Sequence, residues 1–249
     1  MCFELDSEPP IPAISGAAVS HDDLTLEAAD GNRFAAFLAT PDGAAATGIV
    51  ILPDVRGLYR FYEELALRFA ERGSAALAFD YFGRTAGAAK RDDEFDYMEH
   101  VRQTKPELVQ EDVGASVRHL RSLGCTSIFT VGFCFGGRHS WLAAASGHGL
   151  SGAIGFYGSP RERDGVAGPT QRAAEFEAPV LALQAGEDKN ITAEDNAEFA
   201  GALRAAGVEH EVITYEGAPH SFFDRKQEEF SDASADAWRR VTEFVDRYR

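Results

Sequence analysis

The sequence of 249 residues has few cysteines and no long hydrophobic run. Its three cysteines are too few for the disulfide framework of a small secreted protein. Residues 1–6 lack the basic region and the apolar stretch of a signal peptide, and no segment approaches the roughly 18 consecutive apolar residues of a membrane span. We therefore expect a cytoplasmic protein with no membrane partner.

Basic residues are also scarce, since 24 lysines and arginines stand against 40 aspartates and glutamates, for a formal net charge of −16. A field of this sign repels polyphosphate, so we expect no nucleic-acid partner. It also slows the approach of an anionic substrate unless arginines reverse the field locally. No feature of the sequence predicts an oligomeric state.

The hydrophobic pattern predicts one α/β domain over residues 21–249, preceded by an extended arm at residues 1–20 that shows no periodicity. Residues 24–28 and 34–39 alternate around Asp-Gly-Asn at 30–32, which is typical of a β-hairpin. Apolar runs without alternation follow at 48–53, 75–79, 128–131, 153–157, 180–183 and 211–215, mostly separated by helical patterns at 62–72, 107–123, 138–145, 193–206 and 232–248. This order favours a doubly wound, mostly parallel sheet with an antiparallel hairpin at its N-terminal side.

Residues 85–104 interrupt the alternation of strands and helices with a polar segment. We interpret it as an excursion over the top of the sheet. Its acidic run is typical of a solvated helix face, and a lid over a site is the alternative.

The strongest local motif is Gly-Phe-Cys-Phe-Gly-Gly at 132–137, between a predicted strand and a predicted helix. It is a nucleophile elbow with cysteine in place of serine. Small residues such as Gly132 and Gly136 let the backbones of this tight turn pack closely, and the helix N-terminus beside Cys134 favours a thiolate. The alternative is an ordinary buried cysteine in a glycine-rich turn.

Asp188 and His220 each follow a predicted strand, where ligand and catalytic groups gather in open α/β sheets. Alone, Asp188 could be a turn residue or helix cap, and His220 an ordinary loop histidine. The order nucleophile, acid, histidine nevertheless matches the α/β-hydrolase triad. We therefore predict that His220 accepts the Cys134 thiol proton and that Asp188 orients the imidazole.

The cysteine elbow, Gly-Glu-Asp at 186–188 and Gly-Ala-Pro-His-Ser-Phe at 217–222 together resemble the dienelactone hydrolase family of α/β-hydrolases. The resemblance extends from about residue 24 to the end of the chain. It implies the α/β-hydrolase fold and a hydrolase that cleaves a small ester or lactone, in particular a dienelactone or another carboxylate-bearing enol lactone.

The resemblance also implies roles for residues outside the triad. Asp54 stands where family members usually carry a glutamate that engages the resting thiol. The backbone N–H groups of Val55 and Phe135 would form the oxyanion hole. Arg84 would bind the substrate carboxylate, and Arg225 lies one residue later than a second family arginine.

Several alternatives remain open from the sequence. The same triad could serve a general carboxylesterase or an acyltransferase, and Cys134 could instead be a non-catalytic sensor of electrophiles or oxidants. Aromatic residues near predicted strand ends, among them Tyr81, either wall the substrate pocket or pack in the core. No spacing of histidines or cysteines predicts a metal site, no phosphate-binding loop is present, and we expect no cofactor.

Overall fold

The computed structural model describes residues 4, 6–92 and 94–249 of the chain. Its centre is an eight-stranded sheet in the order β1-β2-β4-β3-β5-β6-β7-β8. The strands are β1 (Val19–Glu27), β2 (Arg33–Pro41), β3 (Thr47–Leu52), β4 (Ala75–Phe79), β5 (Ser127–Phe133), β6 (Gly152–Phe156), β7 (Val180–Ala185) and β8 (His210–Tyr215). β2 pairs antiparallel with β1 and β4, whereas the pairs from β4 to β8 are parallel. The predicted sheet with its N-terminal hairpin is confirmed.

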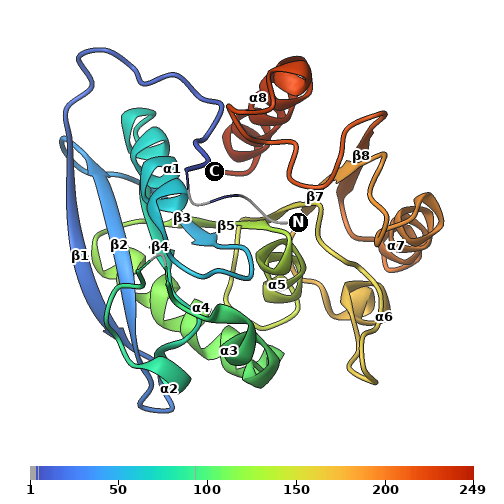
Figure 1. The fold of residues 1–249 in the computed structure, drawn as a ribbon, viewed down its shortest axis with the longest axis horizontal. Helices are drawn as coiled ribbons and strands as arrows, with labels where there is room; N and C mark the ends of the chain where they lie inside the picture. The colour runs from blue at the N-terminus through green and yellow to red at the C-terminus, as the bar shows by residue number, and fades with distance from the viewer. Residues whose placement is uncertain (1–3, 5, 93) are drawn as a thin grey trace.

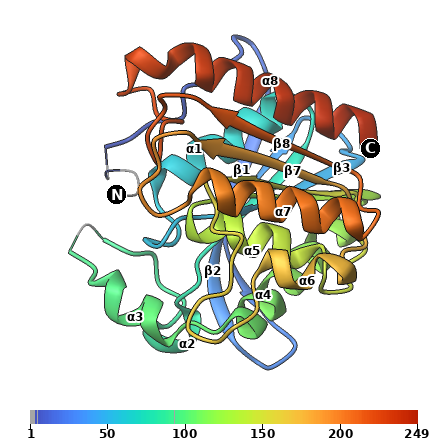
Figure 2. The same ribbon diagram turned by 90° about the vertical axis from the view of Figure 1, so that its right-hand side faces the viewer.

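Helices cover both faces of this sheet (Figures 1 and 2). They are α1 (Arg60–Glu71), α2 (Gly83–Ala86), α3 (Tyr97–Gln103), α4 (Pro106–Ser122), α5 (Phe135–Ala143), α6 (Pro169–Arg172), α7 (Ala193–Ala205) and α8 (Ser231–Tyr248), with 3-10 turns at Ala173–Glu175 and Glu228–Phe230. α1 and α8 pack on one face, and α4, α5 and α7 on the other. Among the described residues, no helix combines the length and apolarity needed to cross a membrane.

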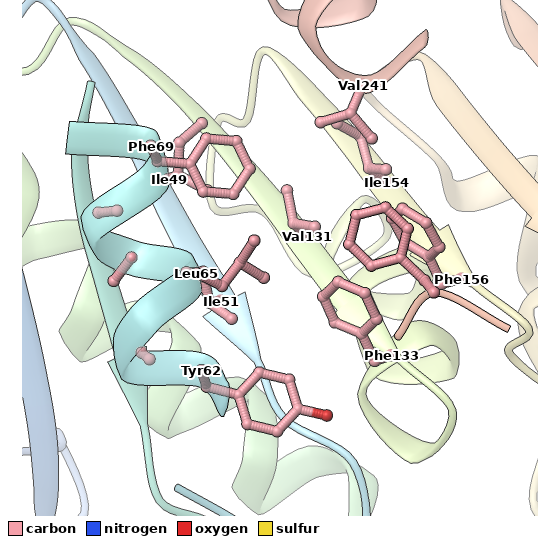
Figure 3. Packing of buried hydrophobic residues seen from close by; sticks show 14 of the residues in the cluster. Ile49, Ile51, Tyr62, Leu65, Phe69, Val131, Phe133, Ile154, Phe156 and Val241 are labelled. Carbon is pink, nitrogen blue, oxygen red and sulfur yellow. The ribbon is translucent and has the colours of Figure 1, made fainter. Parts of the chain in front are cut away.

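The central strands lack alternation because both of their faces are buried. In β3, Ile49 and Ile51 join the cluster under α1 and α8, while Val50 and Leu52 face the cluster under α4. Figure 3 shows side chains from α1, α8 and three strands meeting in the first of these clusters: Ile49, Ile51, Tyr62, Leu65, Phe69, Val131, Phe133, Ile154, Phe156 and Val241.

The strand order reverses at β3, which has β4 on one side and β5 on the other. The connecting helices α1 and α4 accordingly lie on opposite faces of the sheet. Leu52 pairs with Gly132, so the loops that follow β3 and β5 leave the sheet side by side. In open α/β sheets, such a switch point beside the carboxyl ends of the strands is where ligands bind.

The N-terminal arm packs on the loop that follows β8. β1 begins at Val19, and the described residues before it form neither helix nor strand. Ser7 is buried, and its hydroxyl donates a 2.6 Å hydrogen bond to Asp224 Oδ2. Ile11 joins the core cluster on the α1 face. The arm is therefore held against the domain by both polar and apolar contacts.

Candidate active site

Cys134 lies between the end of β5 and the start of α5, at a φ of 54°. A φ in this range is strained for a residue with a side chain. The turn needs residues without a side chain two positions before and after Cys134: a Cβ on Gly132 would lie 2.0 Å from the carbonyl oxygen of Gly136, and one on Gly136 would lie 2.0 Å from that of Leu52. The glycines of the motif thus allow α5 to begin directly against β3 and β5.

The backbone of Cys134 is fixed on both sides. Its N–H donates to the carbonyl of Phe156 over 3.0 Å, and its own carbonyl accepts from the N–H of Gly137 over 3.1 Å. The half-buried thiol is therefore held at the N-terminus of α5. Unpaired N–H groups and the helix dipole at such an end stabilise negative charge on a thiolate or an oxyanion.

Asp188 and His220 are brought together by the loops after β7 and β8. His220 Nδ1 lies 2.5 Å from Asp188 Oδ2, and the N–H groups of Asn190 and Ile191 donate to the other carboxylate oxygen. Burial acts to raise the pKa of Asp188, but the hydrogen bond from His220 and these N–H groups lower it below its ordinary value. Asp188 is thus an ionised acceptor for the imidazole.

The imidazole of His220 lies over the aromatic ring that follows β6. The centroids of the His220 and Tyr157 rings are 4.9 Å apart, and the Tyr157 ring in turn lies 6.3 Å from that of Phe133, the last residue of β5. Because β6 neighbours β5 in the sheet, His220 is placed on the same side of the sheet edge as Cys134. Each residue of the predicted triad therefore follows the carboxyl end of a strand, Cys134 after β5, Asp188 after β7 and His220 after β8.

Asp54 lies beside the elbow, because Leu52 pairs with Gly132 and Asp54 and Cys134 each come two residues after this pair. It is buried, and its N–H donates to the Tyr62 hydroxyl over 2.8 Å. The Tyr59 hydroxyl and the N–H of Arg56 donate to its two carboxylate oxygens over 3.3 and 2.9 Å. Val55, a predicted oxyanion-hole residue, lies inside this turn, which the N–H of Gly57 closes on the carbonyl of Asp54.

Tyr81 is buried beneath the same turn. Its hydroxyl donates to the carbonyl of Pro53 over 2.7 Å. Burial, and then the electrostatic effects of the acidic groups of Asp54, Asp80 and Cys134, raise the pKa of this hydroxyl well above its ordinary value. The structure therefore gives Tyr81 a role in supporting the backbone near Asp54 and Cys134, and its contact with substrate stays a prediction.

Arg84 in α2 is held by two aspartates of the chain. Its Nη1 donates to Asp112 Oδ2 over 2.6 Å, and its Nε and Nη2 donate to Asp30 Oδ2 over 3.0 and 2.8 Å. The Asp112 side chain is fully buried and also accepts from Asn32 over 2.9 Å. Burial raises the pKa of Asp112 to about 6, against the lowering effects of Arg84 and Asn32. The expected substrate contact of Arg84 stays a prediction, because its donors are used within the chain.

Arg225 fastens the N-terminal arm. Its Nη1 donates to Glu8 Oε2 over 2.5 Å, its Nη2 to the carbonyl of Pro9 over 3.1 Å, and its N–H to the carbonyl of Glu8 over 2.9 Å. Its role at the substrate also stays a prediction. The sequence did not predict that Arg225 contacts the arm, because the arm shows no hydrophobic periodicity.

The sequence-based predictions assigned no role to Arg56, although it stands in the loop that follows β3. Two nitrogens of its guanidinium, Nε and Nη1, are buried and have no hydrogen-bond partner among the described residues. Its carbon Cζ lies 5.9 Å from the ring centroid of Tyr97 in α3, so this helix contacts the loop that follows β3. The signal available in the sequence was a charged residue in the loop that follows a buried strand.

Among the described residues, no group of three or more histidine, cysteine, aspartate or glutamate side chains is arranged to hold a metal ion. The other described cysteine, Cys125, is buried two residues before β5. Burial raises the pKa of its thiol, which disfavours the thiolate that a nucleophile requires. Cys2 lies outside the described residues.

The sheet order, the helix layers and the elbow at the end of β5 define an α/β-hydrolase. The Dienelactone hydrolase family model matches residues 34–249. The chain is 30% identical to a carboxymethylenebutenolidase of Rhodococcus opacus over 266 aligned positions, which cover 100% of this chain and 97% of the relative. The chain belongs to the dienelactone hydrolase family and is a carboxylic ester hydrolase.

Solved structures show the same fold. One from Klebsiella pneumoniae, assigned as a dienelactone hydrolase, superposes with a TM-score of 0.81 at 24% identity and covers 93% of this chain and 100% of that chain. A dienelactone hydrolase-like promiscuous phosphotriesterase, P91 from metagenomic libraries, superposes with a TM-score of 0.76 at 19% identity and covers 94% of this chain and 99% of its own.

Proposed function

We propose that the protein hydrolyses a small carboxylate-bearing enol lactone or ester through a Cys134–His220–Asp188 triad. The observation that carries this proposal is the placement of Cys134 at positive φ on the tip of β5, with its thiol at the N-terminus of α5. The pairing of His220 with Asp188 supports it further, because a thiol sensor needs no oriented base.

In the acylation step, the Cys134 thiol proton passes to His220 and the sulfur attacks the lactone carbonyl carbon. Because Asp188 engages Nδ1, the proton is taken by Nε2. Negative charge then develops on the carbonyl oxygen, where the N–H groups of Val55 and Phe135 donate to it. The ring C–O bond breaks, the expelled enol oxygen receives the proton from His220, and a thioester on Cys134 remains.

In the deacylation step, His220 takes a proton from water as the water oxygen attacks the thioester carbonyl. The C–S bond breaks, the carboxylic acid is released and the proton returns to the sulfur. A thiolate is itself a good leaving group, so acylation is efficient only when the expelled oxygen is equally stable. Enol lactones and activated esters meet this condition, and amides do not.

Asp54 modulates the thiol in this scheme. Its carboxylate is buried between Tyr59 and the turn backbone, at the level of Cys134 in the register. A carboxylate so close to the elbow disfavours a second negative charge, so it holds the resting cysteine as a thiol until substrate binds. This restraint protects the nucleophile from oxidation, which requires the thiolate.

The test combines steady-state hydrolysis with intact-protein mass spectrometry, using an aryl acetate and an enol lactone. We expect wild-type protein to gain one acyl group on Cys134 in rapid-quench samples, and the Cys134→Ala variant to lose turnover by about 10³-fold or more. Full activity of Cys134→Ala would exclude the mechanism. Products formed in water with added methanol separate hydrolase from transferase: a methyl ester as the main product would favour the transferase.

A further inference from the structure

We propose that Arg56 binds the carboxylate of the substrate, a role that rests on the proposed hydrolysis of a small anionic lactone or ester. Arg56 directly follows Val55 and stands two residues from Asp54, in the turn closed by the hydrogen bond from the N–H of Gly57 to the carbonyl of Asp54. The N–H of Arg56 donates to Asp54 Oδ1 over 2.9 Å. The backbone of this arginine is therefore fixed at the strand edge where Cys134 lies.

The guanidinium of Arg56 is poised for an anion that the described chain does not supply. Its Nε and Nη1 atoms are buried without a hydrogen-bond partner among the described residues. Donors left in this condition are unfavourable, most of all on a charged group, and an acceptor that binds there removes this cost. In the proposal, the carboxylate of the substrate is that acceptor. Five N–H donors in a planar group suit a carboxylate with two oxygens.

Neighbouring arginines at this end of the molecule are already occupied. Arg84 binds Asp30 and Asp112, and Arg91 binds Asp80 over 2.8 Å while donating to the carbonyls of Ala86 and Gly87. An anionic substrate would have to displace a carboxylate of the chain to use either of these arginines. Arg56 requires no such exchange.

The contact with α3 orients the guanidinium. Cζ of Arg56 lies 5.9 Å from the centroid of the Tyr97 ring. A guanidinium that stacks on an aromatic ring uses its face and keeps its N–H edges for hydrogen bonds. Tyr97 of α3 thereby forms one side of the proposed anion site. The positive charge of Arg56 locally opposes the net charge of −16, which otherwise repels an anionic substrate.

The first test is the ratio of kcat/KM for a carboxylate-bearing enol lactone to that for its methyl ester, in wild type, Arg56→Gln and Arg56→Lys. We expect the ratio to fall by about 10- to 100-fold in Arg56→Gln, and by less in Arg56→Lys, which keeps the charge but not the planar donor set. Arg239→Gln on exposed α8 removes the same charge and should keep the wild-type ratio. A ratio that is unchanged in Arg56→Gln would overturn the proposal.

A binding measurement separates this inference from the proposed reaction. Pyroglutamate is a five-membered lactam with a carboxylate, and pyrrolidin-2-one is the same ring without one; neither is cleaved by a thiolate. Calorimetry or ligand-observed NMR should show that wild type prefers pyroglutamate and that Arg56→Gln loses this preference, whether or not lactones are hydrolysed. No preference in the wild type would overturn the assignment of Arg56 and leave the triad untouched. Circular dichroism confirms that each variant is folded.

Discussion

At the scale of single residues, the site depends on positions where no side chain fits. Gly132, Gly136 and Gly137 each lie so close to backbone atoms of neighbouring segments that a Cβ would clash. None of these three glycines has a positive φ, so the requirement is close approach and not backbone conformation. The positive φ of the motif falls on Cys134 itself, which the surrounding packing holds in place.

We predict that Gly136→Ala abolishes most activity and lowers the melting temperature. The new methyl group would lie 2.0 Å from the carbonyl oxygen of Leu52, and because that atom belongs to the backbone of β3, either the strand or α5 must move. The matched control is Gly201→Ala in α7, where nothing lies within 4 Å of the added Cβ. That change should stabilise the helix by about 0.5–1 kcal/mol. An active, equally stable Gly136→Ala protein would contradict the proposed packing.

At the scale of elements, Arg84 links three segments of the fold. Through Asp30 it ties α2 to the β1–β2 turn, and through Asp112 it ties α2 to α4. Asp112 is buried under these contacts, so its charge depends on Arg84 for compensation. This arrangement predicts a pH-dependent effect on stability when the arginine is removed.

We expect Arg84→Met to destabilise the protein by about 3 kcal/mol near pH 8 and by under about 1 kcal/mol near pH 5. The folded pKa of Asp112 is about 6, above its ordinary 3.8, so its contribution to stability is full below 3.8 and is lost as the pH rises through 6. Without Arg84 the folded pKa rises further, and the loss continues at higher pH. Urea unfolding at the two pH values measures the difference.

The control for this prediction is Arg172→Met, which breaks a more exposed pair with Glu175 and should change stability little at either pH. If Arg84→Met were equally destabilising at both pH values, the loss of stability would not depend on the ionisation of Asp112. A variant of unchanged stability that loses only affinity for an anionic lactone would instead favour the substrate role expected from the family resemblance.

At the scale of the whole molecule, the net charge of −16 opposes the approach of an anionic substrate. Long-range repulsion between exposed charges is screened by salt, since the Debye length falls from about 30 Å at 0.01 M to about 8 Å at 0.15 M. We therefore expect kcat/KM for a carboxylate-bearing lactone to rise over this range of ionic strength, while that for its methyl ester stays level. If kcat/KM for the anionic substrate fell as the ionic strength rose, attraction by the local arginines would outweigh the repulsion from the net charge.

The sequence by itself determined the mostly parallel sheet with its N-terminal hairpin, the helices α1, α4, α5, α7 and α8, and which strands the candidate site residues follow. Buried strands such as β3 and β4 are apolar on both faces, so each appears in the sequence as a continuous apolar run. The tight turn at Cys134 has no room for a Cβ at Gly132 or Gly136, so it appears as a short glycine motif. The ends of these apolar runs predict where the strands end, and therefore that Asp188 and His220 lie beyond β7 and β8.

Only the tertiary structure decided how the charged side chains pair. Arg84 meets Asp112 and Arg225 meets Glu8 across long separations in the chain, and such contacts leave no periodic signal. The same holds for Arg56, whose Cζ lies 5.9 Å from the Tyr97 ring of α3 and whose Nε and Nη1 are buried without a hydrogen-bond partner among the described residues. Hydrophobic periodicity records which face of an element is buried, whereas the partner of a long, flexible cation is set by what the folded chain brings within about 3 Å of it.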